Sequence, residues 1–141
     1  MAEFVYVPIQ LVDDGDSVLL NATSSRGCRK CIGHSEDGSG VITLRNYDRG
    51  CAQYRVSFGA NIAVPAGGAV GPISIAISVR GETRASSEAI VTPTVVDAYF
   101  NVYTSLLVPV SSCESVDVAV VNTSDQPINI QNARLIVGRE E

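Results

Sequence analysis

The chain has 141 residues, of which 45% are apolar and only 18% are charged, against roughly 25% charged residues in an average globular domain. The formal charge is −5 with a single lysine, Lys30, which argues against binding to nucleic acid or to an anionic membrane, since either needs a positive face. The length predicts one domain, residues 1–141. No apolar run reaches the roughly 18 residues of a membrane span, and the first residues lack the basic and apolar regions of a signal peptide. A protein this poor in charge is expected to bury part of its surface against other copies.

Apolar and polar residues alternate with a period of two through most of the chain, which indicates β-strands. In residues 52–58, for example, Tyr54, Val56 and Phe58 share one face, while Arg55 and Ser57 share the other. No stretch shows the spacing of an amphipathic helix, and we expect Val95–Tyr99 to be a turn. The predicted strands, in chain order, are 3–12, 17–22, 40–45, 52–58, 73–80, 85–92, 98–108, 115–122 and 127–137.

Turn-forming residues separate these strands at short intervals, as in Asp13–Asp16, Pro65–Gly68 and Ser124–Pro127. The pattern predicts an all-β fold, an antiparallel β-sandwich or jelly roll of about 8–10 short strands. Near the C-terminus the apolar positions change from even to odd numbers, so we expect a β-bulge near Gln131 and Asn132. The predicted core residues are Tyr54, Val56, Phe58, Ile73, Ile75, Ile77, Val79, Phe100, Val102, Val118, Val120, Leu135 and Val137.

The cysteines form the one cluster with metal-binding spacing. Cys28 and Cys31 are two residues apart, and His34 and Cys51 follow, so these four could ligate zinc. The second pair of a usual zinc motif is missing, and reduced thiols or a disulfide are alternative interpretations of the same residues. We expect no metal to be needed for folding.

Other candidates for chemistry are poorly supported by their surroundings. His34 is the only histidine, and no strand–turn–helix pattern surrounds a serine nucleophile. The Asp13–Asp16 cluster lacks the register of a calcium loop and is interpreted as a solvated turn. We therefore assign no catalytic residue and no cofactor, and we expect a protein that is not an enzyme.

Four segments resemble small virion proteins of phages that infect Gram-positive gut bacteria. They are Tyr54–Ala76, Tyr99–Val102, Val118–Ser124 and Ile130–Val137, and the resemblance extends over roughly residues 40–138. Such proteins look like jelly rolls of the tumour-necrosis-factor/C1q type. The resemblance implies a trimeric surface module, a head decoration or fibre protein, and it supplies no catalytic motif.

Composition and resemblance together lead to the expectation of a homotrimer that binds the major capsid protein lattice on the virion surface, after synthesis in the host cytoplasm. A receptor- or carbohydrate-binding tip of a tail fibre or spore-surface filament is the alternative. We expect residues 1–7 or 28–39 to contact the lattice. The trimer contact is expected to cover one contiguous apolar patch made of Ala76, Tyr99, Tyr103, Leu107, Ala119, Val121 and Ile136.

Overall fold

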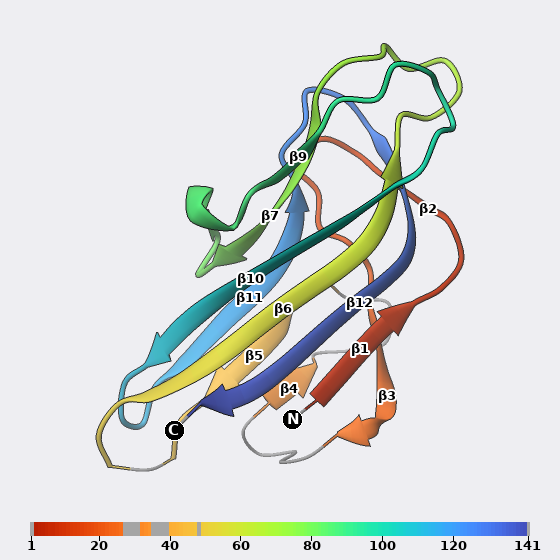
Figure 1. The fold of residues 1–141 in the computed structure, drawn as a ribbon. Coiled ribbons are helices and arrows are strands. Elements are labelled where there is room, and N and C mark those ends of the chain that lie inside the picture. Colours follow the sequence, from red (N-terminus) through yellow and green to blue (C-terminus); the bar gives the residue numbers. More distant parts are fainter. Residues whose placement is uncertain (1, 27–31, 35–39, 48, 141) are drawn as a thin grey trace.

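Two antiparallel sheets pack face to face in the computed structural model, which describes residues 2–26, 32–34, 40–47 and 49–140 (Figure 1). The strands of the described residues are β1 (Ala2–Tyr6), β2 (Gln10–Val12), β3 (Asn21–Arg26), β4 (Ile32–His34), β5 (Ile42–Arg45), β6 (Ala52–Ala63), β7 (Ile73–Val79), β8 (Glu82–Thr83), β9 (Ala89–Val91), β10 (Phe100–Val110), β11 (Ser115–Asn122) and β12 (Ile128–Glu140). One short 3-10 helix, η1, covers Ala85–Ser87. The all-β sandwich predicted from the sequence is confirmed.

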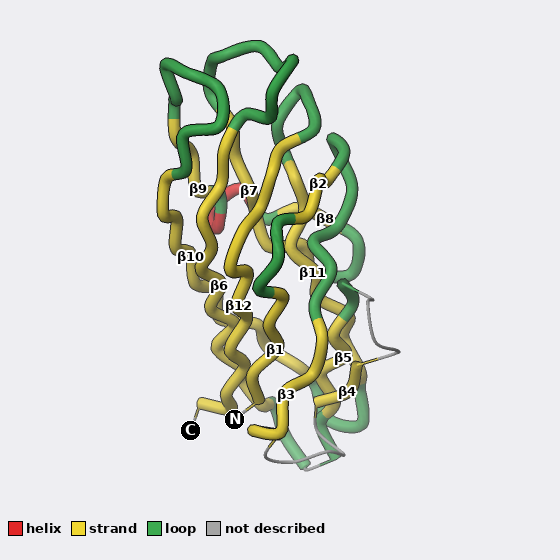
Figure 2. Tube along the Cα trace, turned by 90° about the vertical axis from the view of Figure 1, so that its right-hand side faces the viewer, coloured by secondary structure: helices red, strands yellow, loops and turns green. Residues whose placement is uncertain are grey.

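Sheet A has the strand order β10-β6-β12-β1-β3, with β2 also paired to β12. Sheet B has the order β4-β5-β11-β7-β8, with β9 also paired to β7. Figure 2 shows loops gathered at the end of the sandwich opposite the two chain termini. We call this end the loop end.

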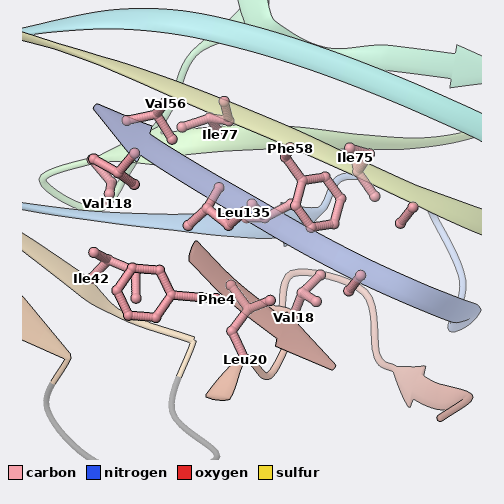
Figure 3. Close-up of a cluster of buried hydrophobic side chains, with 14 of the residues drawn as sticks. Phe4, Val18, Leu20, Ile42, Val56, Phe58, Ile75, Ile77, Val118 and Leu135 are labelled. Atoms are coloured by element: carbon pink, nitrogen blue, oxygen red, sulfur yellow. The ribbon is translucent and has the colours of Figure 1, made fainter. Parts of the chain in front are cut away.

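The core lies between the sheets and is built by the alternation seen in the sequence. Phe58 of β6, Ile75 of β7 and Leu135 of β12 are fully buried and point toward one another from both sheets (Figure 3). Burying an aliphatic or aromatic side chain of this size stabilises a fold by about 1.5–3 kcal/mol. Twelve of the thirteen predicted core residues are buried, and the exception is Phe100.

Phe100 is 42% exposed, so its assignment to the core was wrong. It has the inward parity of its neighbours Val102 and Thr104, but it is the first residue of β10, the outermost strand of sheet A. Alternation specifies the side of the sheet toward which a residue points, and a residue at the corner of an edge strand has fewer neighbours to cover it.

The predicted bulge is confirmed in β12. Its pairing with β6 shifts register between Gln131 and Arg134, and Asn132 has a φ of 54°. The extra residue moves the inward positions from Ile128 and Ile130 to Ala133 and Leu135, all of which are buried. One strand thereby keeps its apolar residues in the core along its whole length.

Four predicted strands were wrong in their extent. The segment 52–58 ends too early, because β6 continues to Ala63. The segment 3–12 is divided into β1 and β2 at Pro8, which has no N–H to donate to a ladder. The segment 17–22 is extended chain with one bridge, Ser17 to Val121, before β3 begins. The segment 85–92 begins with η1, because the Ser87 hydroxyl accepts from the backbone N–H of Ile77 at 2.9 Å and bonds the Arg84 carbonyl at 2.7 Å. The predicted turn at Val95–Tyr99 is confirmed, with Asp97 at a φ of 57°.

Candidate functional site

The candidate zinc ligands are not assembled by the described part of the chain. Cys28 and Cys31 lie outside the described residues, and His34 belongs to β4, opposite Ile42. Cys51 is an exposed free thiol, as is Cys113. Among the described residues, no three His, Cys, Asp or Glu side chains gather as they would around a metal ion.

The apolar patch expected from the sequence is divided by the fold, so its contiguity was wrong. Tyr103 and Leu107 of β10 and Ile136 of β12 belong to sheet A. Ala76 of β7 and Ala119 of β11 belong to sheet B, and both are buried within the single chain. The outward faces of two stacked sheets point in opposite directions, and they cannot form one patch.

One side of the sandwich, which we call the β9–β10 side, carries exposed apolar residues on the edge strands of both sheets. It is the side where β10 ends sheet A and where β8 and β9 end sheet B. Ile90, Phe100 and Leu107 are exposed there. The Thr104 hydroxyl donates to the Ser87 carbonyl at 2.6 Å and joins β10 to η1 across the gap between the sheets. Next to it, a shallow pocket of about 240 Å³ is lined by Val79, Arg84, Ser86, Leu106, Leu107, Val108 and Pro109.

A second hollow lies on the outward face of sheet A, over β10, β6 and β12, and we call it the Gly59 groove. Gly59 is the register partner of Tyr103 on β10 and of Arg134 on β12. Because Gly59 has no side chain, a gap separates the tyrosine ring from the guanidinium group. The groove has a volume of about 360 Å³ and is lined by Ser57, Gly59, Ala60, Asn61, Asn101, Tyr103, Asn132, Arg134 and Ile136.

Polar side chains line one end of the groove in a fixed arrangement. Asn61 and Asn101 are register partners, and the Asn101 amide donates to Asn61 Oδ1 at 3.1 Å. Arg134 is held from the far side, where its Nε donates to Glu3 Oε2 of β1 at 2.7 Å. Asn132 lies at the bulge and is exposed beside the groove. These contacts hold the polar groups in place before any ligand arrives.

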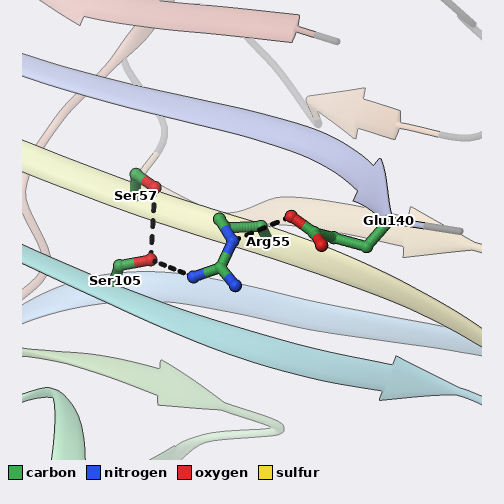
Figure 4. Close-up of polar contacts among 4 residues, drawn as sticks. All are labelled: Arg55, Ser57, Ser105 and Glu140. Atoms are coloured by element: carbon green, nitrogen blue, oxygen red, sulfur yellow. Dashed lines mark hydrogen bonds and ion pairs between the residues drawn. The ribbon is translucent and has the colours of Figure 1, made fainter.

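The opposite end of the groove continues into a second polar cluster. Arg55 Nε donates to Glu140 Oε1 at 2.8 Å, and another guanidinium nitrogen donates to the Ser105 hydroxyl at 3.1 Å (Figure 4). The Ser57 hydroxyl donates to that of Ser105 at 3.3 Å. The outward face of sheet A is therefore polar along β6, with Tyr103 as an exposed aromatic ring in its middle.

Sequence reasoning missed the Gly59 groove, because its walls come from three strands whose register is not visible in the sequence. One signal was available. Gly59 interrupts an otherwise regular strand pattern, and a glycine inside a strand often marks a place where a ligand or another backbone approaches closely. The chemical groups of the groove are an aromatic ring, amides and one ion-paired guanidinium, which are suited to binding.

Comparison with solved structures supports the fold described above. Murine APRIL aligns with a TM-score of 0.54 and 14% identity, covering 95% of this chain and 97% of that chain. Rabbit GITRL aligns with a TM-score of 0.53 and 8% identity, covering 100% of this chain and 95% of that chain. Both are ligands of the tumour-necrosis-factor type, so the fold is similar to the jelly roll that the sequence resemblance implied.

A sugar-binding protein, the EclA C-terminal domain, aligns with a TM-score of 0.45 and 12% identity over 94% of this chain and 79% of that chain. No family model and no curated protein sequence matches the chain. Among the described residues, no helix is long and apolar enough to cross a membrane.

Proposed function

We propose that this protein is a non-catalytic structural module of a phage virion, which acts as a homotrimer and decorates the capsid surface. The observation that carries the proposal is the exposed apolar β9–β10 side. The jelly-roll fold and the resemblance of residues 40–138 to small phage virion proteins support it.

A trimer contact along the edge strands β9 and β10 would cover Ile90, Phe100 and Leu107, which are exposed in the single chain. Apolar side chains gathered in one region of a surface mark an interaction site more often than scattered ones do. In a closed ring of three copies, this side of each copy is covered by the neighbouring copy, so none stays exposed. An open arrangement would leave one exposed at its end and would continue to grow. The β9–β10 side is one of the two surfaces that such a ring requires.

The contact with the capsid lattice belongs at an end of the sandwich, since loops project there. Residues 2–6 form β1 inside sheet A, where Ala2 and Phe4 are buried, so a lattice contact by residues 1–7 would have to use other side chains of the segment. Most of the other expected segment, 28–39, lies outside the described residues. The loop end offers a second surface, where Val70, Val95 and Val96 are exposed.

The loops of that end are tied together. The Asp97 N–H donates to the Val64 carbonyl at 2.8 Å. The Gln126 side chain both accepts from the Ala69 N–H, at 3.0 Å, and donates to the Ala69 carbonyl, at 2.6 Å. A surface held in this way loses little conformational entropy on docking, which favours its use as a lattice contact.

Sedimentation measurements test the trimer. The wild-type chain should sediment at about 45 kDa, three times its mass of 14.9 kDa. Leu107→Asp should give a monomer, because a carboxylate cannot be buried unpaired in the contact. The control is Leu11→Asp, which alters an exposed leucine on β2 and should leave the trimer intact. A wild-type monomer at micromolar concentration would contradict the proposal.

The lattice contact is tested separately by mixing the purified chain with assembled capsids that lack it. We expect co-sedimentation with the capsids, and we expect Val95→Asp to reduce it while the trimer persists. If the wild-type trimer stays in the supernatant, the capsid role is wrong even though the trimer is correct.

The Gly59 groove favours a second candidate function, a receptor- or carbohydrate-binding tip of a tail fibre or spore-surface filament. An exposed tyrosine beside fixed amides is a surface suited to sugars. Binding of the fluorescently labelled chain to an array of glycans distinguishes this function from a purely structural one, which predicts no bound glycan.

A further inference from the structure

We propose that the Gly59 groove is a binding site for a neutral sugar, which stacks on the Tyr103 ring and presents two neighbouring hydroxyl groups to the Asn61–Asn101 amide pair. This inference rests on the second candidate function and names its ligand and its site.

The groove offers space beside an aromatic ring. Tyr103 is 66% exposed, although it lies in the middle of an 11-residue strand. Its register partner on β6 is Gly59, so no side chain stands next to the ring on that strand. The next strand across contributes Arg134. The groove volume of about 360 Å³ lies within the size range of small-molecule pockets, roughly 300–1,000 Å³.

The Asn61–Asn101 amide pair can both donate and accept hydrogen bonds. Each asparagine amide has an oxygen that accepts and a nitrogen that donates. The bond from Asn101 Nδ2 to Asn61 Oδ1 orients both groups and leaves the Asn61 nitrogen and the Asn101 oxygen as a neighbouring donor and acceptor. Two adjacent sugar hydroxyls, of which one accepts and the other donates, match this pair.

The charges around the groove indicate a neutral ligand. The one cation lining the groove is Arg134, and Glu3 neutralises it through a 2.7 Å hydrogen bond. The chain as a whole carries a formal charge of −5. A phosphate or carboxylate ligand would be repelled by that charge and would have to compete with Glu3, whereas a neutral sugar meets neither cost.

The groove is preorganised. Its side chains project from paired strands and not from loops, and the bulge places Asn132 at its rim. Asn132 is anchored by its own backbone, whose N–H donates to the Val7 carbonyl at 3.1 Å. A site that is ordered in advance loses less entropy when its ligand binds.

Calorimetric titration of the wild-type chain with three tetrasaccharides tests the proposal: mannotetraose, cellotetraose and chitotetraose. We expect at least one of them to bind in the micromolar to millimolar range. Tyr103→Ala should weaken that binding at least tenfold, since aromatic anchors often dominate a binding site. Tyr103→Phe keeps the ring and should bind within about threefold of wild type.

A matched pair at Gly59 tests the groove itself. A Cβ atom there would lie 3.7 Å from the Val102 carbonyl oxygen and 3.8 Å from the Tyr103 ring, which are ordinary contacts. Gly59→Ala should therefore fold and still bind, whereas Gly59→Leu should fold but fill the groove and abolish binding.

The sedimentation of each variant is measured alongside its binding. The site is overturned if none of the three tetrasaccharides binds at millimolar concentration, or if Tyr103→Ala and Gly59→Leu bind like wild type. It is also overturned if Tyr103→Ala changes the oligomeric state, because the groove would then be a contact between subunits. Loss of the trimer in Leu107→Asp with sugar binding retained would separate this inference from the structural proposal.

Discussion

The outward faces of the two sheets have the same alternating pattern but different environments. On sheet A, Arg55, Tyr103 and Arg134 extend into solvent around the Gly59 groove. On sheet B, all seven residues of β7 are buried, including Ala76 and the other outward positions. The strand β7 is flanked by β11 on one side and by β8 and β9 on the other. Residues of these neighbouring strands cover its small outward side chains. Alternation thus predicts the face of the sheet to which a side chain points. Its exposure to solvent depends in addition on its size and on the neighbouring strands.

The largest expected change in stability comes from the core between the two sheets. Ile75→Ala removes a fully buried side chain of β7 and should lower the free energy of unfolding by about 2–5 kcal/mol, since it leaves a cavity in the core. Urea unfolding at a fixed chain concentration measures this. A loss below about 0.5 kcal/mol would place Ile75 at the surface and contradict the assignment of faces.

A larger residue on the outward face of β7 should also destabilise the chain. Ala76 is fully buried, so Ala76→Leu should cost about 1–3 kcal/mol through overpacking. The comparison is Gln53→Leu, on the exposed outward face of β6, which should change stability by less than about 0.5 kcal/mol. Equal effects of the two substitutions in urea unfolding would show that the two faces do not differ.

Gly59→Ala should stabilise the chain by about 0.5–1 kcal/mol, because alanine restricts the unfolded chain more than glycine does. The new methyl group meets ordinary contacts. Thermal unfolding followed by circular dichroism should show a higher Tm. A lower Tm would mean that the floor of the groove is packed more tightly than described.

The smallest effect is expected on the outward face of sheet A, at Arg55 and Glu140. Their side chains are each more than 40% exposed, and an exposed ion pair contributes about 0–1 kcal/mol. Arg55→Gln should lower stability by less than 1 kcal/mol, an effect that disappears in roughly 1 M salt because the charges are screened. A loss that persists in high salt would assign the stabilisation to the hydrogen bonds with Ser105.

The sequence predicted much of this fold, because the core strands depend on local alternation. Residues 54–58 and 73–79 have the expected inward faces, and the change of parity in β12 predicted the bulge at Asn132. Phe100 and the segment 17–20 could not be assigned correctly, because their environment depends on which strand lies at an edge and which segment pairs with β11. The Gly59 groove could not be predicted from the sequence for the same reason. Tyr103, Gly59 and Arg134 become neighbours only when three strands are in register.

The bulge in β12 also determines where this strand can change in length. A deletion of one residue within Arg134–Ile136 would shift the later side chains of β12 to the opposite face and direct Leu135 or Val137 away from the core. A deletion of Asn132 alone would instead merge the two halves of β12 into one regular strand, with Ile130 and Leu135 still directed inward. Position 132 is therefore the point in β12 at which loss of a single codon would preserve the core while reshaping the rim of the groove, so ligand preference could change there without a new fold.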